Sequence, residues 1–224
     1  MVWSTLEDTR EALKNSTIPT LNERYKVPPF DTKAEGDHFF VESGVPTTFF
    51  ITPFYWDNFI DMGMEPKKAG DGSYELILPM GNHRLAGMCA EDVGRCALNI
   101  FKHPSEYVNK RIGVRSEALT LKEMAEKMGR ALNKTIRHRD ITLDEYRRQT
   151  FPGAKELGNM FQYYQECENE VVRLRCADTA RKLNPNLMSF DQWLAKYREH
   201  IPLRGWFRFQ VQQNGVQSLF STNW

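Results

Sequence analysis

Val2-Trp3-Ser4-Thr5-Leu6-Glu7-Asp8 opens the chain with apolar and hydroxyl-bearing residues and ends in two acids. Such a run is typical of a buried strand that passes directly into a loop. Buried strands of this kind belong to parallel sheets and have neighbours on both sides. Because open α/β sheets bind their ligands beyond the carboxyl ends of the strands, we expect the residues after this strand to form an active-site loop.

Strands and helices are predicted to alternate through the rest of the chain. Strands are expected at 47–51, 74–78, 85–89, 112–114 and 135–139, and helices at 30–43, 90–102 and 154–165, after a loop over 9–29. Alternation of this kind indicates a largely parallel sheet with helices on its faces. We therefore predict an α/β protein that contains the C-terminal part of a doubly wound, Rossmann-type fold.

Three later helix starts carry capping boxes, in which a polar cap is followed three residues later by Glu or Gln. They begin at Thr120, Thr142 and Ser189. Apolar residues at helical spacing follow the first and the last cap, and we expect them to be core: Leu121, Met124, Ala125, Met128, Leu132, Phe190, Trp193, Leu194, Tyr197 and Ile201. We divide the chain into a Rossmann remnant over 1–115, interleaved with segments of the second domain, a small α/β domain over 116–203, and an atypical tail over 204–224 that is expected to be mobile.

Composition excludes several classes of protein. With 41% hydrophobic residues, 26% charged residues and a net charge of +1, the chain is typical of a globular protein without a nucleic-acid face. No apolar run reaches the roughly 20 residues of a membrane span. The four cysteines form no C-x-x-C pair, so buried, reduced thiols and an intracellular location are expected. Asp92, in the first turn of the 90–102 helix, is expected to be a surface residue that favours the helix dipole.

A glycine-rich phosphate loop is absent from the sequence. Gly70 and Gly72 alone have G-x-G spacing, and no third glycine follows them. Gly70-Asp71-Gly72 is instead typical of a turn. We expect a dinucleotide-binding loop to lie before the strand at Val2, outside this chain, and nucleotide binding by the chain itself to be weak or lost.

Several motifs, in the same order, resemble the NmrA-like family. They are Trp3–Asp8, Gly87–Gly94, the stretch Phe151-Pro152-Gly153-Ala154-Lys155-Glu156-Leu157-Gly158-Asn159-Met160-Phe161, Leu183-Asn184-Pro185 and Asp191–Leu194. The resemblance covers about residues 1–203. It implies a Rossmann domain that binds NADP(H), a smaller C-terminal α/β domain, and similarity to extended, atypical short-chain dehydrogenases. Several members of the family have lost dehydrogenase chemistry and act as nucleotide-responsive regulators.

The resemblance also implies where catalytic residues would lie. Dehydrogenases of this class place a tyrosine four residues before a lysine, on one face of a helix. The lysine holds the nicotinamide ribose and lowers the tyrosine pKa. Lys33 matches the lysine and Ser4 matches the usual carbonyl-orienting serine, but Pro29 stands where the tyrosine would be. The resemblance therefore implies a ribose contact without a general acid.

A second implied contact follows the strand at 47–51. By resemblance, Tyr55, Trp56, Asp57 and Asn58 would lie along the nicotinamide end of the cofactor. The alternative is a strand-end loop whose aromatic side chains pack between domains.

Three hypotheses for function follow. The first is an NADP(H)-responsive regulatory protein without dehydrogenase catalysis, which acts through partner proteins such as transcription regulators. The second is an NADPH-dependent reductase similar to isoflavone reductase, against which Pro29 counts. The third is an interaction module that does not depend on nucleotide. We expect no direct contact with nucleic acid or membrane and a cytoplasmic protein; homodimerisation and a nuclear location stay open.

Overall fold

A three-stranded parallel sheet forms the N-terminal part of the structure. The computed structural model describes residues 1–203, and the predicted tail lies outside the described residues. The sheet has the order β1-β2-β7, with β1 (Val2–Thr5), β2 (Thr48–Ile51) and β7 (Arg111–Gly113). The predicted strands at 47–51 and 112–114 are thus confirmed to within a residue, and the α/β class is confirmed.

β1 lies at the edge of this sheet. Val2 is in register with Thr48 and Thr5 with Ile51. Among residues 1–203, β1 pairs with β2 alone, so its other edge is unpaired. The expectation of neighbours on both sides is therefore not met within the described residues.

Two further three-stranded sheets complete the β-structure. One has the order β3-β6-β8, from β3 (Phe54–Tyr55), β6 (Arg84–Met88) and β8 (Glu117–Thr120), with β8 antiparallel. The other has the order β4-β5-β9, from β4 (Lys67–Lys68), β5 (Tyr74–Ile77) and β9 (Ile136–Arg139). Strands β3, β4 and β8 were not predicted: β3 and β4 have only two residues each, and β8 leads directly into the Thr120 capping box, whose helix pattern dominates this stretch.

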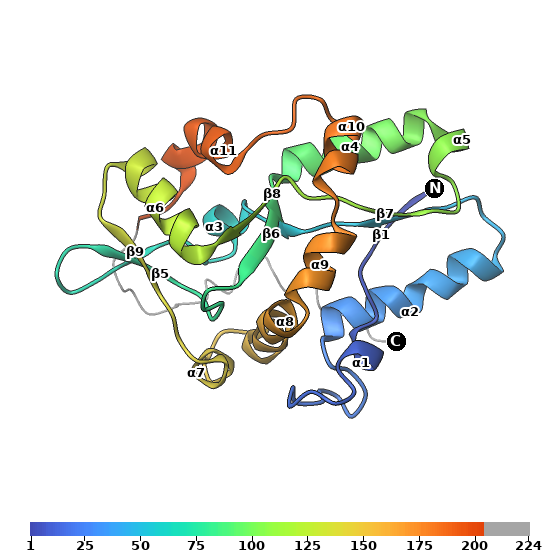
Figure 1. Cartoon of the computed structure of the whole chain (residues 1–224). Helices are drawn as coiled ribbons and strands as arrows, with labels where there is room; N and C mark the ends of the chain where they lie inside the picture. The colour runs from blue at the N-terminus through green and yellow to red at the C-terminus, as the bar shows by residue number, and fades with distance from the viewer. Residues whose placement is uncertain (204–224) are drawn as a thin grey trace, which may run out of the picture.

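Two long helices cover opposite faces of the β1-β2-β7 sheet. Figure 1 shows α2 (Pro28–Glu42) on one side and α4 (Ala90–Lys102) on the other. Both helices were predicted. The other helices are α1 (Thr9–Ala12), α3 (Asn58–Asp61), α5 (Pro104–Tyr107), α6 (Leu121–Leu132), α7 (Leu143–Arg147), α8 (Ala154–Glu166), α9 (Glu168–Leu174), α10 (Ala177–Leu183), α11 (Phe190–Tyr197) and the 3₁₀ turn η1 (Arg198–His200).

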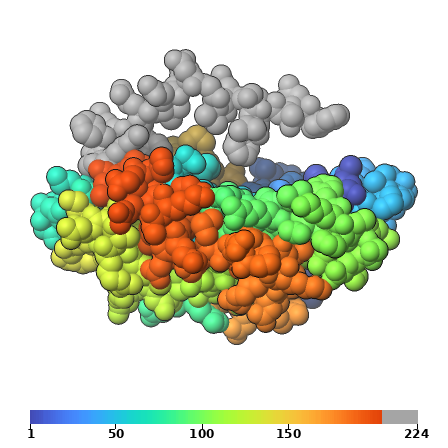
Figure 2. Space-filling view, turned by 90° about the horizontal axis from the view of Figure 1, so that it is seen from above, coloured from blue at the N-terminus to red at the C-terminus, as the bar shows by residue number. Residues whose placement is uncertain are grey.

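The main hydrophobic core joins the two predicted domains. Trp56 and Phe59 pack against Phe190 and Trp193 of α11, with ring centroids 5.1 Å apart for Trp56 and Phe190. A second, smaller cluster lies between the parallel sheet and α4 and includes Phe50, Met88, Cys96 and Ile100. Figure 2 shows α4, α10 and α11 on one face of the molecule. The boundary near residue 115 remains an interpretation.

All three predicted capping boxes are present. The side chains of Thr120, Thr142 and Ser189 each accept from the backbone of the residue three positions later, and the Glu or Gln at that position bonds back to the cap. The predicted core stripes are also buried, except that Leu132 and Tyr197 are half-buried. Local polar patterns were therefore sufficient to predict these helix starts.

Two local predictions were wrong. Asp92 is fully buried, and its carboxylate accepts from the Asn184 side chain at 2.8 Å and the Met188 backbone at 2.9 Å. The loop predicted over 9–29 contains α1, whose N-cap Asp8 accepts from the Arg10 N–H and whose Thr9 donates to the buried Asp31 carboxylate. Asp92 and Thr9 thus each have a partner that is distant in the sequence.

The cysteine prediction holds for two residues. Cys89 and Cys96 are buried, whereas Cys167 and Cys176 are half-buried, and all four are free. No helix within residues 1–203 is long and apolar enough to cross a membrane.

Candidate functional site

Lys33 lies at the carboxyl end of β1. Its ammonium donates to the Ser4 backbone carbonyl at 3.0 Å and is 3.5 Å from the Ser4 hydroxyl. The Thr5 hydroxyl in turn donates to the Lys33 carbonyl at 3.4 Å. The side chain is half-buried, and this burial lowers the pKa of Lys33. An ammonium has three N–H donors, so Lys33 retains a donor for a ligand beside the end of this strand.

No phenol stands one helical turn before Lys33. Pro29 is exposed in the first turn of α2, where its missing N–H costs nothing. Tyr25, the nearest preceding tyrosine, donates its hydroxyl to the Glu35 carboxylate at 3.1 Å. In α2, Pro29 therefore stands where the dehydrogenase pattern requires a proton-donating tyrosine.

The segment from Tyr55 to Asn58 divides into different roles. Tyr55 is half-buried, and its hydroxyl donates to the Thr52 hydroxyl at 2.9 Å. Asp57 accepts from the backbone N–H of Ala90 at 2.8 Å, so its carboxylate holds the start of α4. Asn58 begins α3 and is half-buried. Tyr55 and Asn58 thus have surface available for a ligand, while Asp57 already serves a helix N-terminus.

Trp56 is a core residue. Its side chain is fully buried, and its indole lies over Gly87 of β6, where a Cβ would overlap the ring. The indole N–H has no hydrogen-bond partner within residues 1–203. A cofactor contact through this side chain would need the core to open, so the packing alternative describes Trp56.

An ion pair that sequence reasoning missed lies beyond the ends of β1 and β2. Arg175 is fully buried, and its guanidinium binds both oxygens of Glu7, at 2.5 and 2.8 Å. Its Nε donates to the Thr52 carbonyl at 3.0 Å, directly after β2. The Tyr163 hydroxyl is 3.4 Å from the Glu7 carboxylate. The position of Glu7 after a buried strand was a usable signal, but nothing in the sequence around Arg175 marks it as buried.

The backbone beside Arg175 passes close to β7. Cys176 donates its N–H to the Gly113 carbonyl at 3.1 Å and forms a parallel bridge with Val114. A Cβ on Gly113 would overlap the Leu174 carbonyl, so this close approach needs glycine. Residues 174–176 therefore tie the C-terminal helices to the strand ends.

The half-buried polar side chains of this site can bind and orient a ligand. The tyrosine that would transfer a proton in the dehydrogenase pattern is replaced by Pro29. Of the predicted contacts, Lys33, Tyr55, Asp57 and Asn58 are half-buried and Trp56 is buried, and the Glu7 carboxylate is engaged by Arg175. No group of three His, Cys, Asp or Glu side chains within residues 1–203 could hold a metal ion. The assignment of Lys33, Tyr55, Trp56, Asp57 and Asn58 as cofactor contacts stays a prediction.

Comparison with known families agrees with this architecture. The model of the NmrA-like family matches residues 12–194, which is more than half of the chain. The chain belongs to the NmrA-like family. This confirms the resemblance drawn from the sequence motifs.

Solved structures of NmrA share the fold. A mutant form of NmrA is 22% identical, with a TM-score of 0.67, and the match covers 87% of this chain and 63% of that one. NmrA, a negative transcriptional regulator, in complex with NADP matches with the same identity and coverage and a TM-score of 0.66. The Citrobacter sp. triphenylmethane reductase complexed with NADP(H) is 14% identical, with a TM-score of 0.63 and coverage of 87% and 63%. This NmrA-like chain thus spans less than two thirds of the length of these structures.

Proposed function

We propose that this chain is an NADP(H)-responsive regulatory protein that does not catalyse carbonyl reduction and that acts through partner proteins. The observation that carries the proposal is the pair of positions Lys33 and Pro29 on α2. The lysine is placed at the strand end with a free donor, and the residue four positions earlier has no proton to give. The site therefore keeps a binding group and lacks the matching acid.

The described residues fit the nicotinamide side of a dinucleotide. Lys33, which is half-buried, presents an ammonium that can donate to ribose hydroxyls, and the half-buried Tyr55 adds a hydroxyl. A bound NADP(H) would supply hydride chemistry to an enzyme. In the proposed regulator it supplies a signal, because the oxidised and reduced rings differ in charge and would bind the same residues differently. Solved NmrA is described as a negative transcriptional regulator and was crystallised with NADP, which supports this class of function.

The first test is turnover. Purified chain is incubated with NADPH and a panel of aldehydes, ketones and quinones, and NADPH oxidation is followed by absorbance. We expect no enzyme-dependent oxidation, because the loss of a general acid typically costs about 10²–10⁴-fold in rate. Turnover that Lys33→Ala abolishes would overturn the regulator proposal in favour of a reductase.

The second test is nucleotide contact. Saturation-transfer NMR detects weak ligands and shows which of their protons approach the protein. We expect saturation of the nicotinamide and adjoining ribose protons of NADP⁺, reduced in Lys33→Ala. Lys14→Ala, which changes an exposed lysine, is the matched control. Equal saturation in both variants would contradict the assigned role of Lys33.

An NADPH-dependent reductase is the second candidate. It is supported by Lys33 itself and by the shared fold of the Citrobacter triphenylmethane reductase. A reductase that draws its proton from water or substrate would not need the missing tyrosine, and the turnover test separates the two candidates.

A further inference from the structure

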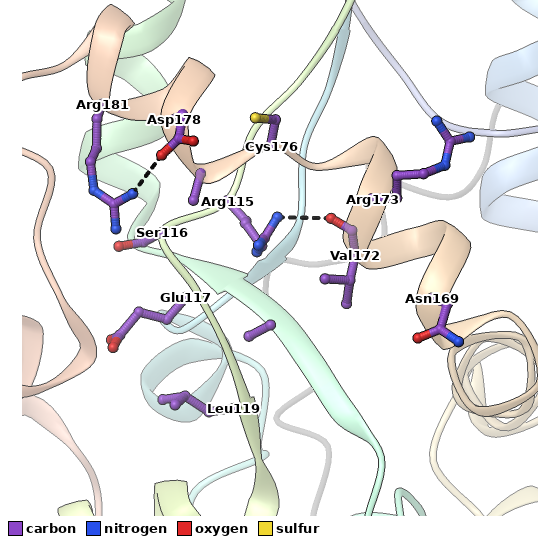
Figure 3. A pocket seen from close by; sticks show the side chains of 12 residues that line it. Arg115, Ser116, Glu117, Leu119, Asn169, Val172, Arg173, Cys176, Asp178 and Arg181 are labelled. Carbon is purple, nitrogen blue, oxygen red and sulfur yellow. Dashed lines mark hydrogen bonds and ion pairs between the residues drawn. The ribbon is translucent and has the colours of Figure 1, made fainter.

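A cavity of about 660 Å³ lies between β8 and the helices α9 and α10. None of its lining residues belongs to the predicted cofactor contacts. Figure 3 shows Arg115 near its centre, Arg181 on α10, and Arg173 with its guanidinium turned away from Arg115. The apolar part of the lining comes from Val172, Leu119 and neighbouring alanines.

Arg115 carries a charge that no carboxylate in residues 1–203 pairs with directly. Its Nη1 donates to the Val172 carbonyl at 2.8 Å and to the Arg175 carbonyl, both at the end of α9. Its Nε is buried without a hydrogen-bond partner among the described residues, and its Nη2 makes no hydrogen bond to them. A half-buried guanidinium is normally paired, because desolvation of a charge is costly. Arg115 is therefore incompletely satisfied.

Other cations surround this guanidinium. Burial lowers the pKa of Arg115, and the charges of Arg84 and Arg181 lower it further. Arg181 pairs with Asp178 at 3.0 Å, and Arg84 pairs with Glu168 at 2.5 Å, so each has one acidic partner. The Cys176 thiol and Asp178 are the favourable charges near Arg115. Glu117 also lines the cavity, with its carboxylate accepting from the Phe190 N–H, so Arg115 lies in a mixed charge environment and has no carboxylate of its own among the described residues.

We propose that this cavity binds a small anion that carries phosphate or carboxylate groups, with Arg115 as its main contact and Arg181 as a second. The Nη2 of Arg115 and the guanidinium of Arg181 would donate to such an oxyanion, and charge-assisted hydrogen bonds of this kind are strong for phosphate and carboxylate alike. The apolar wall would accommodate the carbon skeleton of such a molecule. The site is independent of the proposed function, since it uses no cofactor contact, and it would give the protein a second small-molecule input.

Cys176 provides a built-in reporter for occupancy, because it lines the same cavity. The side chain and backbone N–H of Thr179 lower the pKa of the Cys176 thiol. A bound anion would obstruct the thiol and raise its pKa through like-charge repulsion. Obstruction and the smaller thiolate fraction would both slow alkylation of Cys176, by roughly 3-fold or more near neutral pH.

The experiment measures alkylation of each cysteine by iodoacetamide with peptide mass spectrometry. The intact chain is treated with sodium pyrophosphate, with sodium citrate, or with sodium chloride at matched ionic strength. We expect pyrophosphate or citrate to slow Cys176 and not the half-buried Cys167. Protection by pyrophosphate alone identifies a phosphate site, protection by citrate alone a carboxylate site, and protection by both a general oxyanion site.

Two variants connect protection to the arginines. The ratio of rates with and without anion is compared in Arg115→Gln and in Arg181→Gln; the second changes an exposed side chain and should leave folding intact. Protection should vanish in Arg115→Gln and weaken in Arg181→Gln, with circular dichroism confirming that each variant is folded. If Arg115→Gln does not fold, loss of protection in Arg181→Gln carries the test. No slowing by either probe, slowing equal to that by chloride, or unchanged protection in the folded variants would overturn the proposal.

Discussion

Arg175 binds Glu7 through both terminal nitrogens, in a pair whose arginine has no exposed surface. The same guanidinium reaches the Thr52 carbonyl. One side chain from the C-terminal helices therefore connects the loops that follow β1 and β2. A buried ion pair of this kind adds little net stability over apolar packing, but either charge is costly when left alone.

Removal of the acid from this pair should destabilise the fold. Glu7→Gln leaves the Arg175 charge buried and unpaired, and we expect a loss of about 3–5 kcal/mol in the free energy of unfolding. Urea unfolding followed by circular dichroism measures it. Glu11→Gln is the control, because the exposed Glu11–Lys14 pair should contribute at most about 1 kcal/mol. Equal stability of the two variants would show that Glu7 and Arg175 are not paired.

The sequence could predict half of this arrangement. The strand-to-loop pattern placed Glu7 at a strand end, because a local run of residue types determines where a short buried strand stops. Its partner lies 168 residues away, among helices whose order in space is set by long-range packing. A buried arginine between Leu174 and Cys176 has no local signature.

Trp56 illustrates a different limit. An aromatic side chain after a strand is compatible with a ligand contact and with core packing, and local pattern does not separate them. The packing of Phe190 and Trp193 against it decides the matter. Lys33 was predicted as a ribose contact from its position in the family motif; the structure places its ammonium beside Ser4 at the end of β1, and the ribose contact stays a prediction.

Asp92 should prove structurally important despite its sequence context. Asp92→Ala removes the acceptor for the Asn184 amide and the Met188 backbone N–H. Since buried donors without partners each cost roughly 1–3 kcal/mol and two donors lose their acceptor, we expect a loss of about 2–6 kcal/mol. Thermal or urea unfolding measures it, with exposed Glu126→Ala on α6 as the control. A loss no larger than that of Glu126→Ala would restore the surface interpretation.

The four thiols should differ sharply in reactivity. Burial raises the pKa of Cys89 to about 11 and that of Cys96 to about 12, while hydrogen bonds from Thr179 lower the pKa of Cys176. Because the thiolate is the nucleophile, iodoacetamide should modify Cys176 first in the native chain. Peptide mass spectrometry over a pH series gives the order. Modification of Cys96 as fast as Cys176 would mean that the core around α4 opens readily.

Glu91 should contribute stability that depends on acid pH. The Lys196 ammonium and the Tyr197 hydroxyl, each 2.6 Å from its carboxylate, lower the pKa of Glu91 from 4.5 to about 2. Because the folded pKa is the lower one, the stabilisation is complete above pH 4.5 and is lost as the pH falls towards 2. The stability difference between wild type and Glu91→Gln should therefore shrink over this window in urea titrations. If the difference in free energy of unfolding between wild type and Glu91→Gln stays constant with pH, the Glu91 carboxylate forms no stabilising ion pair with Lys196.

NADPH should bind this chain only weakly. The sequence contains no G-x-G-x-x-G turn, and such turns place the pyrophosphate on backbone N–H groups at a helix start. The contacts predicted here come from Lys33 and the segment from Tyr55 to Asn58. Two or three hydrogen bonds of roughly 1 kcal/mol each do not offset an association cost of at least about 4 kcal/mol.

Isothermal titration of the purified chain with NADPH measures this affinity. Sedimentation in the same buffer measures whether the chain self-associates, as the edge of β1 that is unpaired within residues 1–203 would favour. We expect no saturable heat at micromolar nucleotide, in wild type and in Lys33→Ala alike. Micromolar binding by a monomer would require a phosphate site among the residues of this chain. If Lys33→Ala weakened such binding, the ribose contact of Lys33 would be supported. The expectation of weak binding would nevertheless be wrong, because other residues of the chain would have to bind the phosphates strongly enough to offset the free-energy cost of association.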